Sequence, residues 1–128
     1  SVELIERLCE RLPVPNRLRE LAVAVARDHG IVHRASELKS GTIMKLIERS
    51  DGIRRPQRFE DLLLACEADA RGRTGFEENA YPQRQLLKSA LGAALAVDTS
   101  ALTEQAKGSE LGELIREQRL AAITAALK

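Results

Sequence analysis

The chain has 128 residues, of which 44% are hydrophobic and 30% are charged. This length and composition are enough for one hydrophobic core and exclude a disordered tail. Twenty Lys and Arg residues face 19 Asp and Glu residues, so the net charge of +1 excludes a general attraction to polyanions, and any nucleic-acid contact must be local. No apolar run approaches the roughly 20 residues that cross a bilayer. The start of the chain has no secretion signal, so we expect a cytoplasmic protein without a membrane contact.

The apolar residues indicate an all-α fold. They are mostly Leu, Ala, Ile and Val, with one Tyr, two Phe and no Trp, a composition typical of packed helices. The two cysteines, Cys9 and Cys66, lie within apolar helical patterns and lack the spacing of a zinc site, so we expect both to be reduced core residues. We therefore predict a helical protein of about six helices.

The first half of the chain contains three predicted helices. Apolar residues with a helical period predict a helix over residues 2–12, which Pro13 and Pro15 end. Asn16 is a suitable N-cap for a second helix that ends at Gly30, and residues 31–40 are predicted to form a connector with one helical turn. A third helix begins at residue 40 or 41 and ends at the turn formed by residues 50–52.

The second half contains three further predicted helices. Pro56 opens a helix that runs to about residue 70, because proline suits the first turn of a helix, and Gly72 and Gly75 interrupt the chain after it. Pro82 opens the next helix, which ends near residues 98–100. Ser109 is the expected N-cap of the last helix.

The first candidate site comprises Asp28, His29 and His33, because two histidines four residues apart on a helix can face one metal ion. Gly30 lies between the histidines, which argues against a continuous helix. The alternative is that His29 interacts with a helix C-terminus and that His33 is a surface side chain.

The second candidate site is the charged end of the fourth helix, where Glu67 and Asp69 precede Arg71 and Arg73. A carboxylate there could bind a metal, and arginines beside a glycine could bind phosphates bidentately. The alternative is a charged helix terminus in which the arginines pair with the carboxylates or with water.

The third candidate site is a basic turn that could neutralise several phosphates, formed by Arg49, Arg54, Arg55, Gln57 and Arg58. A solvated turn is equally compatible with these residues. Only Phe76 and Tyr81 could stack on bases near this region, which argues against a protein that reads single-stranded sequence.

Several segments together resemble the C-terminal region of bacterial multifunctional CCA-adding tRNA nucleotidyltransferases. The strongest is residues 66–77, CEADARGRTGFE, which is a long and specific motif. The others are PVPNR at 13–17, TIMKL at 42–46, RPQR at 55–58 and YPQ at 81–83. The resemblance covers nearly the whole chain.

This resemblance implies a part of a larger enzyme. In the family, a separate N-terminal domain binds CTP, ATP and Mg²⁺ and adds CCA to the 3′ end of tRNA; its motifs do not occur here. The resemblance also implies that residues 1–75 are the second half of an HD-type phosphohydrolase domain, whose divalent metal is expected to be Ni²⁺. Asp69 and His29 would be the remaining metal ligands, since the family's His-Asp pair is absent.

Residues 76–128 would form a helical body that faces the tRNA acceptor arm and contacts the N-terminal domain. The resemblance favours phosphate contacts for Arg71 and Arg73, with the turn arginines Arg54, Arg55 and Arg58 as further candidates. The sequence begins at Ser1 without Met, so we expect a piece of a longer protein that is inactive alone. The alternative is an isolated interaction module, such as a homodimerisation unit.

Overall fold

Helices make up all the regular structure in the described part of the chain. A computed structural model describes residues 2–11, 16–72 and 80–128. The helices are α1 (Val2–Arg11), α2 (Asn16–His33), α3 (Ser40–Arg49), α4 (Pro56–Arg71), α5 (Pro82–Leu95) and α6 (Ser109–Ala126), with short 3-10 helices η1 (Ala35–Glu37) and η2 (Ala101–Glu104). The predicted all-α fold of about six helices is therefore confirmed.

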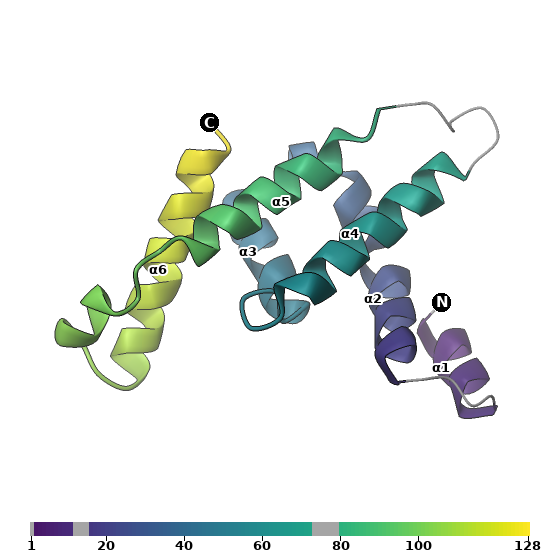
Figure 1. Ribbon diagram of the computed structural model, residues 1–128, viewed down its shortest axis with the longest axis horizontal. Coiled ribbons are helices and arrows are strands. Elements are labelled where there is room, and N and C mark those ends of the chain that lie inside the picture. The colour runs from purple at the N-terminus through teal and green to yellow at the C-terminus, as the bar shows by residue number, and fades with distance from the viewer. Residues whose placement is uncertain (1, 12–15, 73–79) are drawn as a thin grey trace.

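The helices are arranged along one long axis, with α1 and α6 at opposite ends (Figure 1). Helix α2 packs against α1 and α4, and α5 packs against α4 and α6. Helix α3 contacts both α5 and α6. The chain thus forms a continuous series of helix contacts from α1 to α6.

One hydrophobic cluster lies between α2, α3, α4, α5 and α6. Burial of each large apolar side chain stabilises the fold by about 1.5–3 kcal/mol. The largest apolar members of the cluster are Val32, Ile43, Met44, Leu46, Ile47, Phe59, Leu62, Leu63, Leu87, Leu91 and Ile123. The cluster contains residues from before and after the predicted domain boundary between residues 75 and 76. The boundary itself stays a prediction.

Helix α2 continues past the position where we predicted its end. It passes through Gly30 and ends at His33, so the predicted end at Gly30 was wrong. Glycine weakens a helix by only about 1 kcal/mol relative to alanine. Val32 is fully buried and Ile31 packs against the core. Burial of these two side chains offsets the glycine penalty and extends the helix.

The start of α6 also differs from the prediction. Gly108 is the N-cap, with φ 63° and ψ −134°, and Ser109 is the first helical residue, without a side-chain cap. A positive φ favours glycine, because glycine has no Cβ to clash with the backbone. The residue before α6 therefore has a backbone conformation that glycine adopts readily and serine does not.

None of the helices in the described part of the chain combines the length and apolar character that a bilayer crossing requires.

Candidate functional site

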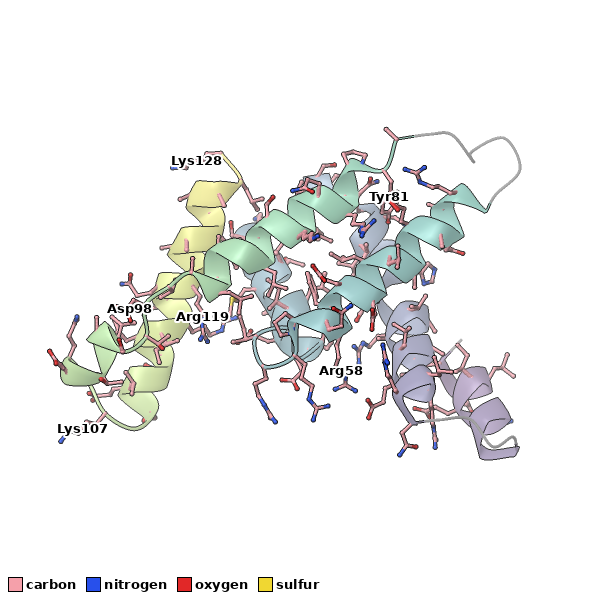
Figure 2. All side chains as sticks on the ribbon, in the orientation of Figure 1. Arg58, Tyr81, Asp98, Lys107, Arg119 and Lys128 are labelled. Atoms are coloured by element: carbon pink, nitrogen blue, oxygen red, sulfur yellow. The ribbon has the colours of Figure 1, made fainter. Side chains whose placement is uncertain are left out.

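A polar cluster joins the end of α2, the end of α4 and the start of α5. His33 Nδ1 lies 2.7 Å from the Tyr81 hydroxyl, and His33 Nε2 lies 3.2 Å from Asp69 Oδ2. We call these three residues the His33 cluster. Figure 2 labels Tyr81 near the C-terminal half of α4. The His33 ring therefore contacts two residues that lie 36 and 48 positions further along the chain.

The fold holds His33 in this position from both its backbone and its side chain. The Gln83 side chain on α5 donates a hydrogen bond to the His33 carbonyl at 3.0 Å. The His33 side chain is 22% exposed, whereas Asp69 is 48% exposed. The cluster is thus anchored on its α5 side and open on its Asp69 side.

Burial raises the pKa values of two side chains in this region, Tyr81 and Cys66. The pKa of the Tyr81 hydroxyl is raised, first by burial and then by the nearby Cys66, Glu67 and Asp69. Burial, followed by the charges of Asp69 and Asp28, raises the pKa of the Cys66 thiol to about 12. Cys66 is free and buried, as predicted, while the side chain of Cys9 lies outside the described part.

The partners of His33 determine which tautomer fits the cluster. An ionised Asp69 can only accept a hydrogen bond, so it favours a proton on Nε2. A protonated Tyr81 hydroxyl can then donate to Nδ1. The cluster therefore holds an imidazole that is oriented by a carboxylate, an arrangement used to transfer protons or bind cations.

The two predicted metal ligands have different partners. The His29 side chain bonds to the Val25 carbonyl through Nδ1 at 2.9 Å, whereas Asp69 is paired with His33. The ring centroids of His29 and His33 are 5.8 Å apart. The described residues contain no group of three or more His, Cys, Asp and Glu side chains that could hold a metal ion. Metal binding by His29 and Asp69 stays a prediction.

Sequence reasoning treated His33 as a surface side chain unless it faced a metal with His29. The i,i+4 spacing of the two histidines was the available signal, and the expected helix end at Gly30 weakened it. Because α2 continues to residue 33, both rings lie on the same side of one helix.

A second polar region is an open cleft of about 1010 Å³ beside α2, the end of α3 and the start of α4. Its lining includes six arginines, and we call it the arginine cleft. Figure 2 shows Arg58 on the side of α4 that faces α2. The lining also includes four carboxylates, and its charged residues are Glu6, Arg17, Arg19, Glu20, Arg27, Arg49, Asp51, Arg55, Arg58 and Asp61.

Asp28 lies beneath this cleft and is fully buried. Its Oδ2 accepts a hydrogen bond from Arg27 Nε at 3.0 Å and lies 2.9 Å from Arg27 Nη2. Its Oδ1 lies 2.8 Å from Arg49 Nη2 without the geometry of a hydrogen bond. A buried carboxylate requires a compensating charge, and Asp28 has two. Asp28 thus pairs with arginines and does not join the histidines.

The other arginines at the cleft form pairs nearer to the surface. Arg58 pairs with Glu20 across the cleft. Arg17 Nη2 lies 3.5 Å from Asp61 Oδ2, and Arg55 Nε lies 3.8 Å from Asp51 Oδ2. Such exposed pairs contribute about 0–1 kcal/mol each, so they exchange partners at little cost.

The predicted RNA-binding arginines are distributed over different surfaces. Arg55 and Arg58 line the arginine cleft, while Arg54 lines a separate hollow of about 330 Å³ beside α6. Arg71 Nη2 lies 3.7 Å from Glu67 Oε1, as the alternative interpretation of a charged helix end expects. Arg73 lies outside the described residues, as does Phe76. Phosphate contacts by these arginines stay predictions, and sequence reasoning did not identify Arg17 and Arg27.

Comparison with known proteins gives relatives for the whole chain. A protein named multifunctional CCA protein from Paraburkholderia phymatum is 50% identical over 129 residues, which cover 99% of this chain and 31% of that protein. Proteins of the same name from Cupriavidus pinatubonensis and Paracidovorax citrulli are 51% and 52% identical, over 100% and 93% of this chain and 31% and 30% of their own lengths. The chain spans less than a third of the length of these relatives. No protein-family profile and no solved structure matches it.

Proposed function

Because the chain matches the C-terminal part of multifunctional CCA proteins over its whole length, we propose that it serves an enzyme that adds and repairs the 3′-terminal CCA of tRNA from CTP and ATP. Its proposed roles are to position tRNA and to contribute to an HD-type phosphohydrolase that acts on 2′,3′-cyclic and 2′-phosphates. The observation that carries the proposal is the identity of about half of all residues across the chain.

The His33 cluster supports the phosphohydrolase role. Imidazole nitrogen and carboxylate oxygen are donors that divalent transition metals accept, and His33 Nε2 and Asp69 Oδ2 lie 3.2 Å apart. His29 lies beside them on the same helix. The described residues do not complete a metal site by themselves, so no catalytic step through a metal follows from them. Mg²⁺ and Ni²⁺ stay predictions for the longer protein.

The arginine cleft supports the tRNA role. Arginine binds phosphate oxygens through two parallel N–H groups, which makes it well suited to a nucleic-acid backbone. The cleft brings six arginines together beside four carboxylates, in a chain whose net charge is only +1. This distribution matches the expectation that any nucleic-acid contact would be local.

A segment exchange tests the proposed function directly. This chain would replace the corresponding C-terminal segment of the Cupriavidus pinatubonensis protein, with which it shares 51% of its residues. The chimera would be assayed for CCA addition to a tRNA that lacks CCA and for hydrolysis of a 2′,3′-cyclic phosphate. We expect both activities to stay within a few-fold of those of the unaltered protein.

The matched control is the same protein without the C-terminal segment. We expect this truncated protein to lose the hydrolysis and to bind tRNA more weakly. A folded chimera that behaves like the truncated protein in both assays would contradict the proposal. Loss of hydrolysis alone would contradict the HD-type role and leave the tRNA role standing.

An isolated dimerisation module stays the alternative. Among the described residues, the exposed large apolar side chains are Leu4, Leu18, Leu64 and Leu95, on α1, α2, α4 and α5. Analytical ultracentrifugation over a range of concentrations tests this alternative. Concentration-dependent association without affinity for RNA would favour it.

A further inference from the structure

Arg27 and Arg49 are held in place by a single buried carboxylate. Asp28 is fully buried, and its two oxygens lie within 3.0 Å of guanidinium nitrogens from α2 and α3. Two arginines and one carboxylate leave one positive charge at this point. Because Asp28 is shielded from water, moving either guanidinium group away would leave a buried charge less well compensated, which costs free energy.

The same two guanidinium groups also face the arginine cleft. Each side chain is 39% exposed, and both line the cleft. A guanidinium has five N–H donors, and each group uses only part of this set on Asp28. The remaining donors are already oriented, so a phosphate that binds them costs less side-chain entropy than one that orders a free arginine.

We propose that the arginine cleft binds the phosphodiester backbone of RNA, with Arg27 and Arg49 as the central phosphate ligands and Asp28 as their positioning residue. This inference rests on the proposed function, because the RNA it assigns to the cleft is tRNA. It places the main contact on α2 and the end of α3, away from Arg71 at the end of α4.

The surface pairs around the cleft set the strength of this contact. Glu20 and Asp61 hold Arg58 and Arg17, so an incoming phosphate competes with these carboxylates. With Asp28, the six arginines face five carboxylates. The cleft therefore binds RNA at low salt and releases it as salt rises, since each neutralised phosphate contributes about 0.7–0.9 to the slope of log affinity against log salt.

The lining favours a nucleic-acid backbone over a free nucleotide. A nucleotide pocket holds its base by stacking on aromatic rings, and none of the described residues that line the cleft is aromatic. Phosphate contacts position a nucleic acid without reading its sequence. The cleft thus suits the recognition of shape and charge.

The test measures binding of a fluorescein-labelled tRNA transcript to the 128-residue chain by fluorescence anisotropy at several KCl concentrations. Arg49→Gln should weaken binding roughly tenfold, as expected for lost hydrogen bonds to a charged group. It should also lower the salt slope by about 1. Arg17→Gln, at a side chain that is 80% exposed, should weaken binding by a smaller factor without affecting the fold.

Asp61→Asn provides the opposite change. It removes the carboxylate that holds Arg17 and should tighten tRNA binding. The matched control is Arg116→Gln, which removes one positive charge on α6, outside the cleft, and should change binding by less than about twofold if the contact is local. Circular dichroism confirms that each variant is folded.

Three outcomes would overturn the inference. If folded Arg49→Gln and Arg17→Gln bind tRNA as the unaltered chain does, the cleft is not the contact, although the proposed tRNA role survives. Competition by ATP as effective as that by unlabelled tRNA, at equal phosphate concentration, would indicate a nucleotide pocket. An unaltered chain that does not bind tRNA at low salt would overturn both this inference and the proposed tRNA role.

Discussion

Arg116 on α6 and Glu48 on α3 form an ion pair through two nitrogens, although 68 positions separate them in sequence. Arg116 Nε lies 3.0 Å from Glu48 Oε2, and Nη2 lies 3.1 Å from Oε1. The hydrogen bonds and charge of Glu48 raise the pKa of the Arg116 guanidinium. The contact therefore joins two helices that are far apart in the sequence.

The Arg116 pair should make a small contribution to stability that depends on salt. Both side chains are 41% exposed, so Arg116→Gln should lower the free energy of unfolding by at most about 1 kcal/mol. Urea denaturation at low and high KCl measures this change, with Glu48→Gln and the double variant completing the cycle. A coupling energy that does not fall at high salt would contradict a mainly electrostatic pair.

Tyr81→Phe should remove one hydrogen bond from the His33 cluster and keep the ring. The expected loss in the free energy of unfolding is about 0.5–1.5 kcal/mol, because His33 Nδ1 loses its partner at 2.7 Å. Urea denaturation checks the loss. The comparison variant is Gln85→Ala, which removes an exposed side chain on α5 and should change stability by less. Equal losses in the two variants would contradict a structural role for the hydroxyl.

The pH dependence of the single tyrosine should report the burial of Tyr81. The chain has one Tyr and no Trp, so absorbance near 295 nm follows this hydroxyl alone. Its pKa in the folded chain is raised above the ordinary value of 10.0. Burial favours the neutral form, so its contribution to stability is complete below pH 10.0 and falls as pH rises above it. Ionisation at pH 10.0 in the folded chain would contradict this environment.

Cys66 should be unreactive while the chain is folded. Burial raises the pKa of its thiol to about 12 from an ordinary 9.0, so almost no thiolate exists at pH 8. A thiol reagent should modify Cys66 only after unfolding in urea, which peptide mass spectrometry can detect separately from Cys9. The stabilising effect of the neutral thiol is lost as pH rises from 9.0 toward 12. Rapid modification of Cys66 in the folded chain would contradict its burial.

Substitution by alanine should have opposite effects on stability at two glycines near the start of α6. Gly108→Ala should lower the free energy of unfolding by about 1–3 kcal/mol, because Gly108 has φ 63° and ψ −134°. Gly112→Ala should raise it by up to about 1 kcal/mol, since Gly112 is helical and a Cβ there meets nothing within 4 Å. Thermal and urea denaturation check both. Equal effects would contradict the backbone conformation at Gly108.

Helix positions followed largely from local sequence. Helix α3 spans Ser40–Arg49 and α4 spans Pro56–Arg71, close to the bounds that the apolar period and Pro56 predicted. Three helix termini were predicted wrongly. Helix α2 continues past Gly30, α5 ends at Leu95 and not near residues 98–100, and Gly108 is the N-cap of α6 in place of Ser109. In α2 the burial of Val32 decided the outcome, and at α6 the positive φ of Gly108 did.

The candidate sites could be predicted only in part. Asp69, His29 and the basic turn were visible in sequence, whereas the contacts of Asp69 with His33 and of Asp28 with Arg49 join different helices. Sequence spacing predicts neighbours within one helix, because residues three and four apart share a face. It does not predict which faces of two helices meet.

The sequence by itself determined the all-helical class, most helix bounds and the resemblance to CCA-adding enzymes. These depend on local propensity, on a 3.6-residue period and on a long motif. Tertiary structure decided which charges pair. It buried Asp28 beneath Arg27 and Arg49 and brought Tyr81 to His33. The reason is physical, since the energy of a charge depends on its burial and on partners from distant parts of the chain.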